Sequence, residues 1–380
     1  MLRLSRMLSG GYLLLALLIT LLTLFVGPIG WAPFQFTTIG PGGAPVIVTV
    51  AYGTEKEQWL KAAVERFTAT NPHVGGRPVQ IILTGIGSRE MVSQVVQGTL
   101  QATVVSPASM VQIDQLRTAW MIANKGGSVI GADAPKSLVI TPLVLLAWKD
   151  RAAPIDQAAP GDFWMAIQKA LTASGGQMHF GHTNPETSNS GLQTLLLLAA
   201  DYGDLSVDQV QSTDFRNWLR GVEQAVPSKE DSTGTLTTDM LRFGPSKYDF
   251  VAVYENLAIE AMDSPAAGGN GGLRVIYPPT TILSDHPYAV LSAPWVTSEQ
   301  RQAAIQFRDF LLSSEIQQLA FQKYGFRPAS QQVQINPSDT SSPFGRYAIN
   351  GVQLNLPSQL SIPPGEVIDA LIRTWKSVKQ

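Results

Sequence analysis

Residues 178–200 read Met-His-Phe-Gly-His-Thr-Asn-Pro-Glu-Thr-Ser-Asn-Ser-Gly-Leu-Gln-Thr-Leu-Leu-Leu-Leu-Ala-Ala. This stretch predicts a short apolar strand, then a polar loop and a long apolar helix. The loop carries Thr187, Ser188, Asn189 and Ser190. The first N–H groups of a helix lack intrahelical acceptors, and they lie at the positive end of the helix dipole. Hydroxyls and an amide around such a start favour an anion or another polar ligand. An ordinary N-cap by Thr187 or Ser188 fits the same residues, so both interpretations stay open.

The same alternation of strand and helix patterns extends along most of the chain. Strands are predicted at 46–51, 79–83, 103–106, 138–148, 249–255, 273–277 and 288–291, with Pro142 as a break in the fourth. Helices are predicted at 54–67, with Thr54 as N-cap, and at 88–97, 162–171, 298–312, 313–323 and 364–379. This order is typical of an α/β fold with largely parallel sheets.

Polar residues recur where a predicted strand ends and a helix begins. Ligands bind at the carboxyl ends of strands in open α/β sheets. Four such loops, divided between two α/β halves, predict a cleft between two lobes. The candidate ligand-binding residues are Gly53, Thr54, Glu55, Ser106, Ser109, Thr187, Ser188, Asn189, Ser190, Tyr254 and Glu255.

The composition narrows the class of protein. The chain has 380 residues, enough for two lobes with cores of their own. Its net charge is −2 and it has no basic stripe, so we expect no nucleic-acid partner. It has no cysteine, which excludes disulfides, thiol catalysis and a lipidated N-terminal cysteine.

The N-terminus predicts a membrane anchor. Arg3 and Arg6 precede an apolar run at 12–31 that is long enough to cross a bilayer. The positive-inside rule then places residues 32–380 outside the cytoplasm, with 1–11 as a cytoplasmic tail and 32–45 as a linker. The location expected is a single-pass position in the cell membrane. The alternative is a cleaved signal peptide, although Gly27-Pro28-Ile29-Gly30 makes a poor cleavage site.

No catalytic, metal or cofactor site is predicted. The chain has no Gly-x-Ser-x-Gly and no His-Glu-x-x-His motif. His179 and His182 lie three positions apart in a predicted strand, which puts them on opposite faces. His286 follows Asp285, and we expect a structural hydrogen bond for it. The chain is therefore expected not to be an enzyme.

Several segments resemble bacterial extracellular solute-binding proteins with the type 2 periplasmic-binding fold, the family that serves ABC importers. The resemblance covers roughly residues 46–330. Val46–Phe67 is similar to the opening strand and helix of the family, and the loop after Thr183-Asn184-Pro185-Glu186 resembles the anion-binding loop of some members. The most specific segments are Phe310-Leu-Leu-Ser-Ser-Glu and Tyr324-Gly-Phe-Arg-Pro-Ala329, which resemble the late helix pair and its turn.

The resemblance implies a two-lobed α/β fold with lobe 1 at 46–144, lobe 2 at 145–275, and a return to lobe 1 with the C-terminal helices at 276–380. It also implies capture of a small polar ligand, with an oxyanion among the candidates, for an ABC permease in the cytoplasmic membrane. The alternative function is a non-transporting ligand sensor or a cell-surface interaction module on the same fold.

Overall fold

Two sheets organise the part of the chain that the computed structural model describes, residues 43–379 except 124–125, 159, 330–332, 334 and 337. The predicted tail, the anchor at 12–31 and nearly all of the predicted linker lie outside these residues. None of the described helices is long and apolar enough to cross a membrane. The predicted anchor therefore stays a prediction.

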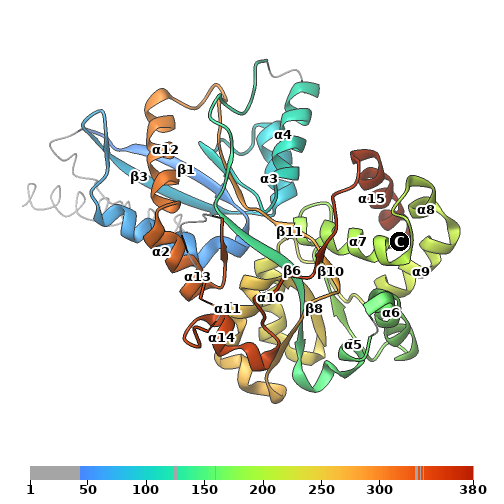
Figure 1. Cartoon of the computed structure of the whole chain (residues 1–380). Coiled ribbons are helices and arrows are strands. Elements are labelled where there is room, and N and C mark those ends of the chain that lie inside the picture. The colour runs from blue at the N-terminus through green and yellow to red at the C-terminus, as the bar shows by residue number, and fades with distance from the viewer. Residues whose placement is uncertain are drawn as a thin grey trace, which may run out of the picture. The chain divides into compact units, whose positions relative to one another are not determined.

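The first sheet has the strand order β2-β3-β1-β4-β12-β5, and with its helices it forms lobe 1. Its strands are β1 (Val46–Tyr52), β2 (His73–Val74), β3 (Arg77–Gly85), β4 (Val104–Ser106), β5 (Lys136–Ser137) and β12 (Pro287–Val290). Its helices are α2 (Glu57–Ala69), α3 (Ser88–Gln97), α4 (Met110–Ile122) and α12 (Ser298–Leu311), and the short turn η1 (Thr54–Lys56) precedes α2. Figure 1 shows α12 and α2 beside β1 and β3.

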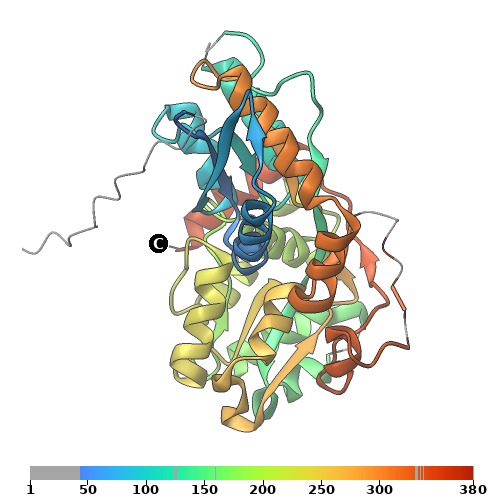
Figure 2. The same cartoon turned by 90° about the vertical axis from the view of Figure 1, so that its left-hand side faces the viewer.

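The second sheet contains β11 (Leu283–Ser284), β6 (Val139–Trp148), β8 (Phe250–Tyr254) and β7 (Phe180–Gly181) in that order, with β9 (Leu273–Ile276) also paired to β6. With its helices it forms lobe 2. These helices are α5 (Ala153–Asp156), α6 (Phe163–Ala173), α7 (Asn189–Tyr202), α8 (Val207–Gln211), α9 (Thr213–Glu223), α10 (Thr233–Phe243) and α11 (Glu255–Met262). In Figure 2, lobe 1 lies above and lobe 2 below.

Chain segments that cross between the lobes explain why the sheets are mixed rather than largely parallel. β6 enters from lobe 1 and pairs antiparallel with both β8 and β9. β12 returns from lobe 2 and pairs antiparallel with β4, whereas β1 is parallel to β3 and β4. Pro142 does not break β6, because the strand continues through it and pairs it with Leu283.

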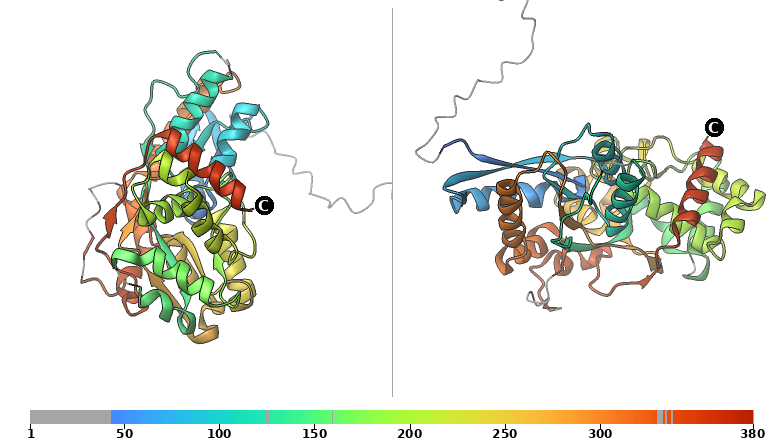
Figure 3. Two further views of the ribbon diagram at one scale, coloured as in Figure 1. Left: turned by 90° about the vertical axis from the view of Figure 1, so that its right-hand side faces the viewer. Right: turned by 90° about the horizontal axis from the view of Figure 1, so that it is seen from above.

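The C-terminal part joins both lobes. α13 (Ser314–Tyr324) packs on α2, and β13 (Arg327–Pro328) pairs with β6. α15 (Gly365–Lys379) packs instead on α7, α8 and α9 of lobe 2, where Leu371 and Trp375 enter the core. The view from above in Figure 3 shows α15 at the lobe 2 end. The expected return of 276–380 to lobe 1 therefore does not include the last helix, because the apolar side chains of α15 belong to the core of lobe 2.

Two short strands and one short α-helix lie outside the elements named so far. These are the strand pair β10 (Thr280–Thr281) and β14 (Ser358–Gln359), and the short helix α14 (Pro343–Arg346). The pair β10–β14 ties the segment before α15 to the chain that follows β9.

Candidate functional site

The N-termini of four helices meet at the boundary between the lobes. The backbone N–H groups of Arg89 and Glu90 at the start of α3 donate to the carbonyl of Thr187, just before α7. The hydroxyl of Ser190 in α7 lies 2.7 Å from that of Thr233 in α10. The starts of α3 and α4 are joined as well, because Ser88 Oγ accepts from the N–H of Ala108. These contacts place four positive helix ends around one region.

The start of α7 has no side-chain cap. Ser188 is the N-cap residue, yet its hydroxyl accepts from no backbone N–H of the first turn. It lies instead 3.3 Å from Ser190 Oγ. The start of α3, at Gly87, is also without a side-chain cap, whereas Ser109 caps α4 and Ser232 caps α10. The interpretation that the Thr187 or Ser188 side chain caps α7 is therefore wrong, although Ser188 occupies the N-cap position.

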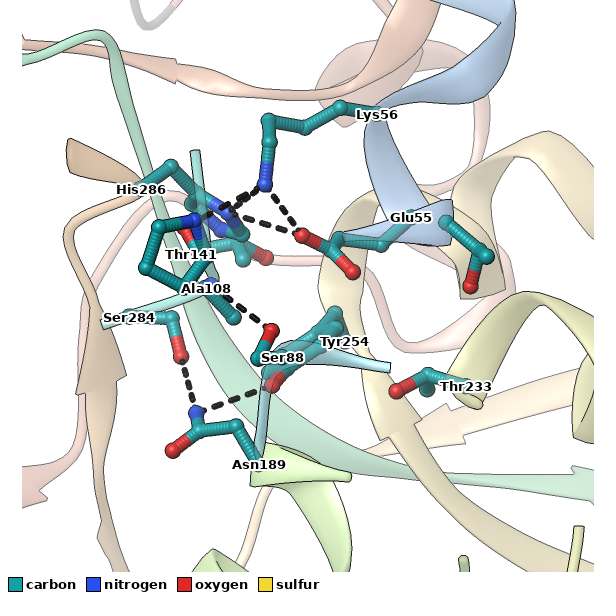
Figure 4. Close-up of polar contacts among 12 residues, drawn as sticks. Glu55, Lys56, Ser88, Ala108, Thr141, Asn189, Thr233, Tyr254, Ser284 and His286 are labelled. Atoms are coloured by element: carbon teal, nitrogen blue, oxygen red, sulfur yellow. Dashed lines mark hydrogen bonds and ion pairs between the residues drawn. The ribbon is translucent and has the colours of Figure 1, made fainter. Parts of the chain in front are cut away.

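Asn189 is at the centre of a buried network of polar side chains (Figure 4). Its Nδ2 donates to the hydroxyl of Tyr254 at 3.0 Å and to that of Ser284 at 3.4 Å. Its Oδ1 accepts from Gln112 Nε2 of lobe 1 at 3.0 Å. Gln193, one turn further along α7, also donates to Ser284. This network joins α4, α7, β8 and the β11 crossover.

A buried cluster of three ionisable side chains lies beside this network (Figure 4). Lys56 Nζ is 2.5 Å from Glu55 Oε1 and 3.1 Å from His286 Nδ1. Burial would raise the pKa of Glu55, but Lys56 and His286 lower it to about 2. Burial lowers the pKa of Lys56, and burial together with Lys56 lowers that of His286. Glu55 and Lys56 thus form a buried ion pair without net charge, and the lowered pKa of His286 favours the neutral form of its imidazole.

His286 is held by the backbone on both sides. Its φ of 41° lies in the left-handed region, which is rare for a residue other than glycine. Its N–H donates to the carbonyl of Ala108, and its own carbonyl accepts from the N–H of Leu138. The structural hydrogen bond expected for His286 is present, with Glu55 and Lys56 as partners of its ring.

The structure joins several candidate residues through direct contacts. The Gly53 N–H donates to the carbonyl of Ser106, so the ends of β1 and β4 lie side by side. Thr54 is not the N-cap of α2, which begins at Glu57 after η1. Its Oγ1 instead accepts from the N–H of Gly234 in α10. Thr54 therefore bridges the lobes.

Glu255 lies apart from this group. Its carboxylate accepts two hydrogen bonds from the Arg327 guanidinium at 2.7 Å and one from the Tyr277 hydroxyl. Its neighbour Tyr254 ends a strand and contacts Asn189, whereas Glu255 begins a helix and contacts β13. The structure therefore gives Glu255 a structural role and does not bring it to the ligand-binding candidates.

Several residues of the region were not predicted from the sequence. Lys56 lies on the predicted helix at 54–67, and Ser88, Gln112, Thr233 and Ser284 belong to none of the four polar loops from which the candidates were taken. Among the buried side-chain atoms of the described residues, some near the cluster have no protein hydrogen-bond partner: Ser106 Oγ, Gln112 Oε1, Gln193 Oε1, Asn256 Oδ1 and His286 Nε2. Buried polar atoms are normally satisfied, so such atoms are suited to bind a ligand or water.

The described residues contain no group of three or more histidine, aspartate or glutamate side chains that could hold a metal ion. His182 is instead buried against Glu223, with 2.9 Å between His182 Nε2 and Glu223 Oε1. His179 has another acidic neighbour, with 3.6 Å between His179 Nδ1 and Asp249 Oδ2.

Residues 48–327 match the family model of bacterial extracellular solute-binding proteins. The match covers more than half of the chain, so the chain belongs to this family. A comparison with curated protein sequences finds no significant match.

Solved structures of type 2 periplasmic binding proteins share the fold. The sulfate-binding protein SubI from Mycobacterium tuberculosis H37Rv has a TM-score of 0.57 and 22% identity, covering 88% of this chain and 98% of that one. A periplasmic thiamin binding protein has a TM-score of 0.60 and 14% identity, covering 88% and 96%. Iron-bound HitA from Pseudomonas aeruginosa has a TM-score of 0.56 and 16% identity, covering 88% and 100%. At these identities the likeness establishes the two-lobed fold, and the family establishes an extracytoplasmic solute-binding protein.

Proposed function

We propose that this chain captures a small oxyanion between its lobes and delivers it to an ABC-type importer. The observation that carries the proposal is the start of α7, where an uncapped helix end of lobe 2 lies among buried hydroxyls. Oxyanion oxygens accept strong, charge-assisted hydrogen bonds from such N–H and O–H groups. The positive end of the helix dipole adds a favourable electrostatic contribution.

The charge of the surrounding side chains also supports an anion held mainly by neutral donors. The positive charge of Lys56 is compensated by Glu55, and burial raises the pKa of Tyr254, which keeps its hydroxyl protonated. The binding residues proposed are Gly53, Thr54, Ser106, Thr187, Ser188, Asn189, Ser190 and Tyr254, joined by Ser88, Thr233 and Ser284. Glu55 is proposed to contribute as the partner that compensates the charge of Lys56, because an ionised carboxylate cannot donate to an anion. Ser109 is proposed to act as the cap of α4.

The similar structures agree with a small polar ligand and do not fix which one. SubI is by its name a sulfate-binding protein, whereas other similar proteins are named for thiamin or iron. Among these three, the name of SubI fits a site of hydroxyls and helix ends without a cluster of metal ligands. Sulfate is therefore the first oxyanion to test, with phosphate and molybdate beside it.

Membrane anchoring belongs to the same proposal. We propose that the apolar segment at 12–31 holds the chain in the cytoplasmic membrane, with the lobes outside, next to the permease. Co-purification from membranes tests which partner the anchored chain has. Permease and ATPase subunits in the eluate would support delivery to an importer, whereas a kinase or an adhesion protein would favour the sensor or interaction module.

Thermal unfolding with added anions tests the ligand class. A ligand present at 100 times its dissociation constant stabilises the folded state by about 2.7 kcal/mol. We expect at least one oxyanion to raise the unfolding midpoint by several degrees, and Ser190→Ala to reduce that shift. Ser93→Ala, an exposed hydroxyl on α3, is the matched control. If sugars or amino acids stabilise the chain and no oxyanion does, the proposed ligand class is wrong.

A further inference from the structure

His182 lies fully buried directly after β7, next to the loop that leads into α7. Both of its ring nitrogens face an oxygen atom. Nδ1 is 2.9 Å from the carbonyl oxygen of Thr183, and Nε2 is 2.9 Å from Oε1 of Glu223 in α9. Neither His182 nor Glu223 is among the residues proposed to bind the ligand.

The carboxyl of Glu223 is ionised. Burial would raise its pKa, but His182 and Lys229 lower it to about 2. Lys229 Nζ lies 3.0 Å from Oε2 of Glu223, and the same ammonium lies 5.9 Å from the centre of the Trp375 ring. Each oxygen of this carboxylate therefore faces a nitrogen atom, and the carboxylate has no proton to donate to His182.

The two acceptors determine the protonation of the imidazole. A backbone carbonyl and an ionised carboxylate can only accept hydrogen bonds, whereas a neutral imidazole has a single N–H donor. The two contacts of 2.9 Å therefore require an N–H on both ring nitrogens of His182, which makes the ring an imidazolium. A neutral ring would turn a bare nitrogen towards one of the two oxygens.

The carbonyl that accepts from His182 also lies against the first turn of α7. A Cβ on Gly191 would be 2.2 Å from the carbonyl oxygen of Thr183, so the helix backbone passes close to this oxygen. The hydroxyl of Thr183 lies 2.8 Å from that of Ser190, which belongs to the proposed oxyanion site. The position of Thr183 therefore sets where the start of α7 lies.

We propose that His182 is a positioning residue for the oxyanion site: as a buried imidazolium it is held by Glu223 and donates to the Thr183 carbonyl, which fixes the start of α7. His182 does not contact the ligand and acts through Thr183. Charge-assisted hydrogen bonds are stronger than bonds between neutral groups, so the loop is held in place before the ligand arrives. The effect on binding rests on the proposed function, whereas the protonation of the ring does not.

Nitrogen-15 NMR of the full chain, labelled at histidine and without added ligand, measures the protonation of the ring. The chain has four histidines, so the ring signals are few, and His182→Gln identifies those of His182 by their loss. His73 is exposed and serves as the reference in the same spectrum. At a pH where the His73 ring has become neutral, we expect both ring nitrogens of His182 still to carry a proton. A bare nitrogen on His182 at that pH would overturn the proposal.

Titration calorimetry with sulfate, phosphate and molybdate measures the effect on binding. His182→Gln keeps a neutral donor near the position of Nε2 and removes the donor to Thr183, so we expect the dissociation constant to rise by about tenfold. His182→Asn keeps an amide donor near the position of Nδ1 and should retain more affinity than His182→Gln. His179→Gln, at a partly exposed position of the same segment, is the matched control and should bind as tightly as the unmodified chain.

The outcomes separate this inference from the proposed function. Equal affinities of the unmodified chain and His182→Gln for an oxyanion that binds would overturn the positioning role and leave the proposed function standing. A weaker affinity in His182→Asn than in His182→Gln would contradict the action through Thr183. If none of the three oxyanions binds while His182 carries both protons, the proposed function is wrong and the buried imidazolium is supported.

Discussion

Gln112 of lobe 1 donates from its Nε2 to Oδ1 of Asn189 in lobe 2 at 3.0 Å, and both side chains are buried. The two residues are 77 positions apart, so this contact exists only because the lobes meet. Since Asn189 also contacts Tyr254 and Ser284, its orientation depends on both lobes at once.

Gln112→Ala should therefore weaken ligand binding. The substitution leaves Asn189 Oδ1 buried without its donor, which costs on the order of 1–3 kcal/mol. We expect the dissociation constant for the oxyanion that stabilises the chain to rise by about tenfold, measured by isothermal titration calorimetry. Gln97→Ala on exposed α3 is the control and should bind as tightly as the unmodified chain. An unchanged affinity in Gln112→Ala would show that this contact plays no part in binding.

Gly87→Ala should hinder closure without unfolding either lobe. A Cβ at Gly87 would lie 2.5 Å from the carbonyl oxygens of both Thr187 and Asp231, which belong to lobe 2. The φ of Gly87 is −58°, so alanine suits the backbone itself. We expect a loss of ligand affinity of at least tenfold, with a far-ultraviolet circular dichroism spectrum like that of the unmodified chain. Gly161→Ala, whose Cβ meets no atom within 4 Å, is the control.

Lys56→Met should destabilise the fold strongly. It leaves the Glu55 carboxylate buried without its cation, and breaking a buried pair in this way typically costs about 3–5 kcal/mol. Urea unfolding at pH 7 measures the loss. Adding Glu55→Gln to Lys56→Met removes the uncompensated charge and should recover part of the stability. A double variant no more stable than Lys56→Met would contradict the pairing.

The same pair predicts an acid dependence. Because the pKa of Glu55 is lowered to about 2 from 4.5, its contribution to stability is complete above about pH 4.5. It is lost progressively as the pH falls from there towards 2. The free energy of unfolding, measured with a chemical denaturant, should therefore differ less between pH 3 and pH 6 for Glu55→Gln than for the unmodified chain. If the two chains lose the same free energy of unfolding between pH 6 and pH 3, folding does not lower the pKa of Glu55.

Arg327→Leu should reduce stability and leave ligand affinity nearly unchanged. Arg327 makes two hydrogen bonds to Glu255 and two to the carbonyls of Gln353 and Leu354, so it ties the chain after β13 to α11. We expect the unfolding midpoint to fall by several degrees while the dissociation constant changes less than threefold. If Arg327→Leu loses much of its ligand affinity while its stability is normal, Glu255 takes part in ligand binding after all.

The fold was predictable because its signals are local and periodic. The helix at 88–97 and the strand and helix around 46–69 follow apolar patterns that a sequence displays directly. α10 was not predicted, because Thr233, Gly234 and Thr235 have weak helix propensity and resemble a loop. The start of α10 matters because Thr233 contacts Ser190 and Gly234 contacts Thr54 of lobe 1.

The candidate site was predictable where the chemistry lies in one contiguous segment. Thr187 to Ser190 form such a segment, and the structure places it at the start of α7. The burial of Lys56 depends on His286, 230 positions away, so no local pattern reveals it. Glu255 follows Tyr254 directly, but Tyr254 ends β8 and contacts Asn189, whereas Glu255 begins α11 and contacts Arg327. Because Tyr254 and Glu255 are adjacent in the sequence, both were predicted to bind the ligand, whereas the fold places their side chains in different contacts.

Native mass spectrometry of the full chain, purified under mild conditions, tests most directly whether the region around Asn189 and Ser190 binds an oxyanion. We expect a bound mass that matches a small oxyanion, that is lost on gentle unfolding, and that is absent from the Ser190→Ala variant. A bound sugar, amino acid or other neutral compound, or an oxyanion retained equally by Ser190→Ala, would contradict the proposed ligand and its site.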